Sequence, residues 1–191
     1  MKKIKILSLL FCVVMLVAAC HDDEEGPIIP QPREQVGRTV LVYIVGDNGV
    51  NELSDLFKTN FEDMKEGMKE VDYSKCNLVV YSEMVNDVPR LVSLKKQNGK
   101  VVADTLFTYS EQNPLAKEVM SSVISQTVSY FPADSYGFVF LSHSSSWVPA
   151  TNDANSRSIG YYRRTQMNIP DFHDVLLSSF PRPLKFILFD S

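Results

Sequence analysis

Four runs of apolar residues recur along the chain and predict the strands of a central sheet. They are TVLVYIVG at 39–46, NLVVYS at 77–82, YGFVFLS at 136–142 and LKFILFD at 184–190. The apolar positions are continuous rather than alternating, which is typical of strands that are buried on both faces of a parallel sheet.

Amphipathic segments lie between these runs and predict helices. Residues 51–70 carry apolar side chains at roughly helical spacing, namely Leu53, Phe57, Met64 and Met68. Asn113-Pro114 joins a capping residue to a proline and predicts the start of a second helix, while Ile169-Pro170-Asp171 opens a third. The alternation predicts an α/β fold, a three-layer αβα sandwich around a mostly parallel sheet.

A β-hairpin is expected between the second and third strands of this pattern. Residues 90–95 and 101–105 flank Gln-Asn-Gly, and an Asn-Gly pair favours a tight turn. We expect this hairpin to form a small ribbon beside the main sheet.

Polar residues follow each predicted strand: Gly46-Asp47-Asn48, Ser82-Glu83, Ser142-His143-Ser144 and Asp190-Ser191. Ligands of open α/β sheets bind beyond the carboxyl ends of the strands, so we expect a site at this edge. His143 is the strongest candidate, because an imidazole can exchange protons near neutral pH. A solvated histidine in a surface loop is an equally good interpretation of its position alone.

Other chemistries fit the sequence less well. The serines around His143 lie outside any Gly-x-Ser-x-Gly elbow, which argues against a serine hydrolase. The three histidines are scattered and no zinc motif occurs, so no metal site is predicted. A polar loop at Asn152, Asp153 and Asn155 leaves weak calcium binding open, although its spacing is not that of an EF-hand. No other cofactor is expected.

The N-terminus has the features of an export signal. Three lysines precede an apolar stretch at 6–17, which is too short to span a bilayer stably. Val17-Ala18-Ala19-Cys20 closes it and resembles a bacterial lipobox, in which the cysteine is lipidated. We therefore expect a signal peptide at 1–19 and a lipid anchor on Cys20; the alternative is an ordinary signal peptide with a chance cysteine.

Residues 20–37 are expected to form a tether. Acidic residues at 22–25 precede three prolines, a composition that favours an extended spacer over a packed structure. Acidic residues after the lipidated cysteine also resemble the surface-export signal of Bacteroidetes lipoproteins. The expected location is the outer membrane or cell surface, with the folded part at 38–191.

Composition limits the remaining possibilities. The chain has 191 residues, a net charge of −4 and a pI near 5.4, which fits one domain and gives no general attraction to nucleic acid. Cys76 is the cysteine left after export and lipidation, and it begins the apolar run CNLVVY. We expect an inert buried thiol there.

Three blocks of the sequence resemble the clostripain family of cysteine peptidases, a caspase-like group. They are YIVGDNGVNELSD, FLSHSSSWVPA and LKFILFDS, and the resemblance covers roughly residues 38–191. The family pattern has a Gly-Asp-Asn-like turn, then His-Gly-x-Gly-Trp, then Phe-Asp-x-Cys. The chain carries serines in place of both glycines of the second block, at Ser144 and Ser146.

The resemblance implies a His/Cys dyad in which His143 assists a cysteine expected just after Ser191. It also implies an oxyanion-hole role for the backbone amide of Ser144, and a place for Asp190 near a pocket for Arg or Lys side chains. A cut between the two catalytic blocks, at Arg157, Arg163 or Arg164, is a further expectation; a solvated loop is the alternative.

Two functions remain open. The first is a membrane-anchored lipoprotein peptidase that acts on peptides, of which the 191-residue chain is a fragment ending in an exposed apolar edge strand. The fragment alone is expected to be inactive and prone to aggregation. The second is a non-catalytic lipoprotein that binds peptides or surface components on a degenerate peptidase scaffold.

Overall fold

The computed structural model describes residues 30–49, 51–144 and 158–190. The chain divides into two compact units, residues 1–30 and 31–191, and only the second is described below. Several predictions fall outside the described residues: the signal peptide, Cys20, most of the tether, Ser146, Arg157, Ser191 and the loop with Asn152, Asp153 and Asn155. Within the described part, no helix is long and apolar enough to cross a membrane.

A six-stranded sheet forms the centre of the second unit, in the order β4-β3-β2-β1-β5-β8. All four predicted strands are present and run parallel to one another, as β1 (Val36–Val45), β2 (Cys76–Glu83), β5 (Ala133–Ser142) and β8 (Phe186–Asp190). The predicted hairpin is present as β3 (Arg90–Gln97) and β4 (Lys100–Thr108), which are antiparallel.

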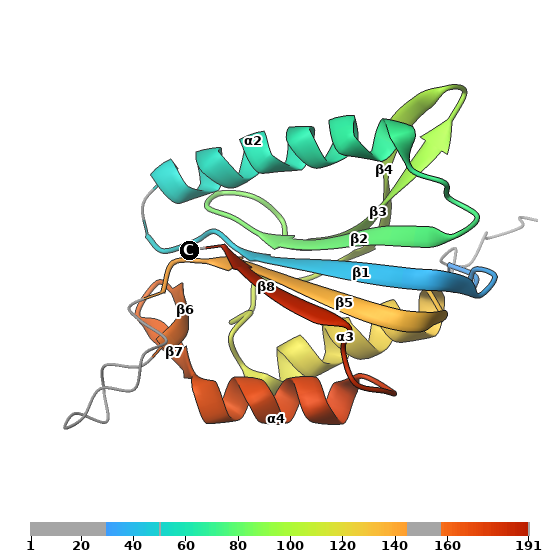
Figure 1. Ribbon diagram of the computed structural model, residues 1–191. Helices are drawn as coiled ribbons and strands as arrows, with labels where there is room; N and C mark the ends of the chain where they lie inside the picture. Colours follow the sequence, from blue (N-terminus) through green and yellow to red (C-terminus); the bar gives the residue numbers. More distant parts are fainter. Residues whose placement is uncertain (1–29, 50, 145–157, 191) are drawn as a thin grey trace, which may run out of the picture. The chain divides into compact units, whose positions relative to one another are not determined.

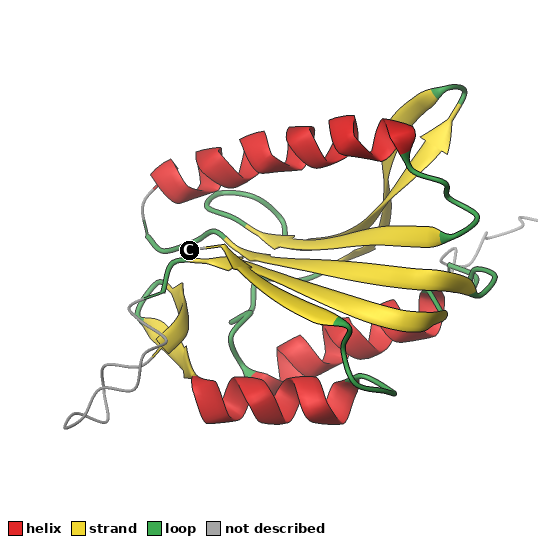
Figure 2. Ribbon diagram, viewed as in Figure 1, coloured by secondary structure: helices red, strands yellow, loops and turns green. Residues whose placement is uncertain are grey.

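Helices cover both faces of this sheet, as Figures 1 and 2 show. Helix α2 (Asn51–Gly67), followed by the 3-10 turn η1 (Met68–Glu70), lies on one face. Helices α3 (Lys117–Tyr130) and α4 (Ile169–Ser179) lie on the other. The predicted α/β class, with its three-layer arrangement and mostly parallel sheet, is confirmed.

Two details of the sequence prediction were wrong. The hairpin is not a separate ribbon, because β3 pairs with β2 and extends the main sheet; its Asn98-Gly99 turn has the expected positive φ angles of 51° and 78°. Helix α3 begins at Lys117 rather than at Pro114. The side chain of Asn113 accepts a hydrogen bond from the amide of Leu115 at 3.0 Å, and this turn precedes the helix instead of capping it.

The larger core lies between the sheet and the helices α3 and α4. Alternate residues of the central strands point into it, and aromatic rings dominate: Tyr43 stacks on Tyr81 with 4.5 Å between ring centroids, and Phe140 lies 5.3 Å from Phe172 of α4. A smaller aliphatic core lies under α2. Both faces of β1, β2 and β5 are therefore buried, which explains their continuous apolar runs.

A second, two-stranded sheet was not predicted. It consists of β6 (Ser158–Tyr162) and β7 (Thr165–Asn168), which pair antiparallel immediately before α4. Its apolar residues Ile159, Tyr162 and Met167 are buried in the larger core. Helix α4 then begins at the predicted place, with the Asn168 side chain accepting a hydrogen bond from the amide of Asp171 at 2.7 Å.

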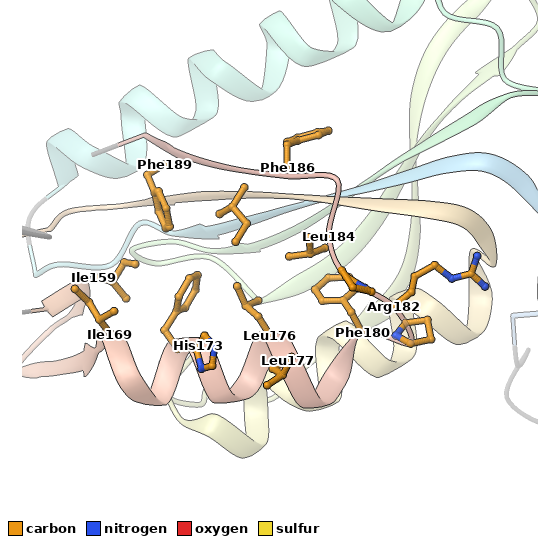
Figure 3. Close-up of a pocket in the computed structure, with 14 residues that line it drawn as sticks. Ile159, Ile169, His173, Leu176, Leu177, Phe180, Arg182, Leu184, Phe186 and Phe189 are labelled. Atoms are coloured by element: carbon orange, nitrogen blue, oxygen red, sulfur yellow. The ribbon is translucent and has the colours of Figure 1, made fainter.

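Strand β8 occupies one edge of the six-stranded sheet and leaves apolar side chains exposed. The exposed fractions are 39% to 50% over Phe186, Ile187, Leu188 and Phe189. A groove of about 780 Å³ runs between β8 and α4, with Phe189 on one wall and Leu176 on the other (Figure 3). Such an exposed apolar edge favours contact with further polypeptide.

Candidate functional site

The parallel strands bring their carboxyl ends to one edge of the sheet, as expected. The register sets Val45 of β1 beside Glu83 of β2 and beside Ser142 of β5. In β8, Asp190 pairs with Leu141 of β5. Residues from four separate parts of the sequence are thus side by side at this edge, which is where open α/β sheets bind ligands.

His143 follows β5 directly and its side chain is exposed. The imidazole packs against the ring of Tyr161 from β6, with 5.5 Å between centroids and 51° between the planes. The buried hydroxyl of Ser142 accepts a hydrogen bond from the Tyr161 amide at 3.2 Å. An exposed imidazole held from one side is able to exchange a proton with a group that approaches from the other.

The other two predicted site residues are near the same edge. Ser144 follows His143 and is half-buried, and Asp190 is exposed on the neighbouring strand. The structure therefore brings His143, Ser144 and Asp190 to one edge of the sheet. Their catalytic roles stay predictions.

An ion pair that the sequence did not predict lies beside them. Asp47 is buried just beyond β1, and its Oδ2 accepts a hydrogen bond from Nε of Arg163 at 2.7 Å. The backbone amide of Arg163 also donates to the Asp47 carbonyl oxygen at 2.9 Å. The guanidinium reaches Glu111 as well. Arg163 was predicted only as a cleavage candidate, since sequence gives no sign that it meets Asp47 116 residues earlier.

Arg163 lies at the turn between β6 and β7 with a φ of 52°. This left-handed conformation costs a residue with a Cβ about 1 kcal/mol. The contacts with Asp47 and Glu111 offset that cost, so the turn is fixed by its side chain rather than by a glycine.

Glu83 lies behind this ion pair at the end of β2 and is only 2% exposed. The backbone amide of Asp47 donates a hydrogen bond to its carboxyl group, while Oε2 has no partner among the described residues. Burial, and then the nearby charge of Asp47, raise the pKa of Glu83 to about 7, although Arg163 opposes the shift. The pKa of Glu83 therefore lies near neutral pH, and perturbed pKa values of this kind are common in functional sites.

Cys76 does not belong to this site. It begins β2, so it lies at the opposite edge of the sheet from His143. The thiol is half-buried rather than fully buried as predicted, and it approaches the carbonyl oxygen of Asp72 at 3.6 Å. Burial raises the pKa of the thiol, which keeps it protonated and unreactive.

No group of three or more His, Cys, Asp or Glu side chains within the described residues is arranged to hold a metal ion. The predicted weak calcium loop lies outside those residues. The geometry at the edge is therefore that of a histidine directly after a buried strand, supported by an aromatic ring and with no cysteine beside it among the described residues.

Comparison with known proteins agrees with this geometry. The model of the Clostripain family, Peptidase C11, matches residues 42–191. A secreted C11 cysteine protease from Bacteroides thetaiotaomicron, solved with an irreversible peptide inhibitor, is 39% identical with a TM-score of 0.69; the match covers 81% of this chain and 42% of that one. An inactive zymogen C11 protease from Parabacteroides distasonis is 32% identical with a TM-score of 0.66, covering 83% and 42%.

A cysteine protease from B. fragilis is 41% identical with a TM-score of 0.54, and the match covers 62% of this chain and 98% of that one. No curated protein matches the sequence. The chain spans less than half the length of the C11 proteases from B. thetaiotaomicron and P. distasonis. The family model covers most of the chain, and the chain belongs to the clostripain family.

Proposed function

We propose that the chain forms the histidine-bearing part of a cell-envelope cysteine endopeptidase, with His143 as the catalytic histidine. The observation that supports this most directly is the register of β8 on β5. Asp190 pairs with Leu141, so a strand continuing in the same register would bring the second residue after Asp190 alongside His143. In the family pattern that residue is the nucleophilic cysteine.

The proposed chemistry is amide hydrolysis through an acyl-enzyme. His143 takes the proton of the cysteine thiol, the thiolate attacks the scissile carbonyl carbon, and the imidazolium returns the proton to the leaving amine. The Ser144 amide donates to the oxyanion. Water then hydrolyses the thioester and releases the second product.

Preference for Arg or Lys side chains is the substrate specificity that we propose. Asp190 is exposed at the same edge and supplies the negative charge that such a side chain requires. The proposed reaction does not require a metal ion. Whether calcium affects activity is tested by comparing cleavage with and without it.

We propose further that the protein is exported and anchored through a lipid on Cys20. The sequence of the N-terminal segment supports this, and the relative from B. thetaiotaomicron is described as secreted. Metabolic labelling with an alkyne fatty acid should mark the wild-type protein and should not mark Cys20→Ser. Labelling of both proteins would contradict the anchor.

The peptidase proposal is tested with the product of the complete reading frame that contains this sequence. Fluorogenic peptides ending in Arg or Lys should be cleaved, and His143→Ala should reduce cleavage at least about 100-fold, the usual contribution of a catalytic acid–base. His173→Ala, an exposed histidine on α4, is the matched control and should retain activity. Equal activity in both variants would exclude His143 as the catalytic residue.

A non-catalytic binding protein is the second candidate. Ser144 stands where the family pattern has glycine, and its Cβ leaves less room for a substrate to approach the backbone. Calorimetric binding of intact Arg- or Lys-containing peptides, without cleavage and without a cysteine after Ser191, would favour this alternative.

A further inference from the structure

The β6–β7 hairpin lies close against the sheet beside His143. A Cβ added at Gly160 of β6 would lie 2.9 Å from Leu115 and 3.0 Å from the ring of Phe140. The flanking residues Ile159 and Tyr162 are buried. The hairpin is therefore packed on β5 near its carboxyl end, at Phe140, three positions before the histidine.

Two sets of contacts hold this hairpin at its two sides. On one side the Tyr161 amide donates a hydrogen bond to the hydroxyl group of Ser142, the last residue of β5. On the other side Arg163 binds Asp47, at the end of β1, through both its guanidinium and its backbone amide. The hairpin thus connects the ends of β1 and β5, which are neighbours in the sheet.

Tyr161, whose amide makes the first of these attachments, also contacts the imidazole of His143 through its aromatic ring. His143 follows the end of β5, where its backbone is no longer held by strand pairing. A ring fixed on a rigid hairpin restricts the rotamers open to a neighbouring imidazole.

We propose that Arg163 and Asp47 are positioning residues for His143, acting through the hairpin and the ring of Tyr161. The importance of this arrangement for catalysis rests on the proposed function, but the restraint of the His143 ring by Tyr161 does not. Arg163 accepts the left-handed backbone conformation at the turn, where glycine is the usual residue, because its side chain is required for the ion pair.

Arg163→Gly distinguishes the effect of the ion pair from the effect of the backbone turn. Glycine adopts a φ of 52° without strain, and the backbone amide at position 163 can still donate to Asp47, so the hairpin should form while its side-chain attachment is lost. Arg164→Ala, the exposed neighbour in the same turn, is the matched control. Tyr161→Leu keeps the ion pair and removes the ring.

The test follows the His143 ring resonances by NMR in the full chain at one fixed pH. Wild-type His143 should show a chemical shift displaced by the Tyr161 ring. Both Arg163→Gly and Tyr161→Leu should move that chemical shift towards the value of a free histidine, while Arg164→Ala should match the wild type. The readout needs no peptidase activity, so a failed activity assay leaves it interpretable.

Two results would overturn the proposal. Wild-type shifts in a folded Tyr161→Leu variant would show that the ring does not restrain His143. Equal shift changes in Arg163→Gly and Arg164→Ala would show that any change at the turn has the same effect. If Arg163→Gly fails to fold, Asp47→Asn removes the charge of the same pair, and unchanged His143 shifts in that variant would equally contradict the proposal.

Discussion

Replacing Glu83 by glutamine should remove a large part of the pH dependence of folding between pH 5 and pH 8. Glutamine has nearly the same shape and stays neutral throughout this range. The wild-type carboxyl group is buried beside Asp47, and its pKa is raised from 4.5 to about 7. The charged form is therefore disfavoured in the folded protein.

The sign follows from proton linkage. The folded protein binds the Glu83 proton more tightly than the unfolded chain does, so its contribution to stability is present below pH 4.5 and is lost as the pH rises through 7. One pKa unit corresponds to about 1.4 kcal/mol, which sets a maximum of about 3 kcal/mol. We expect about 2 kcal/mol between pH 5 and pH 8, because part of the loss occurs below pH 5, where the carboxyl group of the unfolded chain begins to ionise.

Urea unfolding of the wild type and Glu83→Gln at pH 5 and pH 8, followed by tyrosine and tryptophan fluorescence, measures this difference. The charged groups that face Glu83, namely Asp47, Arg163 and Glu111, are present in both proteins, so contributions to stability that do not involve Glu83 should largely cancel. Glu118→Gln, the same change at an exposed site on α3, is the control. If Glu83→Gln loses stability with pH in parallel with the wild type, Glu83 does not titrate in this range.

Three further predictions concern packing and self-association. Ser54→Ala should lower the free energy of unfolding by about 1 to 3 kcal/mol in urea titrations, because the buried hydroxyl bonds the backbone just after both β1 and β2. Gly160→Ala should cost about 1 to 3 kcal/mol, since its Cβ meets the core side chains of Leu115 and Phe140. The Cβ of Gly137→Ala approaches the ring of Phe186 more closely still, but this ring is partly exposed on the edge strand and can turn outward, so that change should cost less. Ile187→Lys should reduce self-association in sedimentation experiments, whereas Leu56→Lys, at an exposed leucine of α2 on the other face of the sheet, should not.

The outline of the fold was predictable because it depends on local sequence. Continuous apolar runs predicted four strands, amphipathic spacing predicted α2, and Ile169-Pro170-Asp171 predicted the start of α4. The start of α3 was misjudged by three residues, because Asn113 serves a preceding turn. Both short strands of the β6–β7 hairpin were missed, since runs of four and five residues carry little periodic signal.

The sequence by itself determined that His143 would follow a buried parallel strand, and hence that it would lie with other polar strand ends at one edge of a sheet. Only the tertiary structure decided what surrounds it. Arg163 meets Asp47 across 116 residues, and Tyr161 reaches the histidine from a hairpin held by that pair. Such contacts depend on how distant segments pack, because hydrophobic patterning specifies which face a residue occupies and not which partner it meets there.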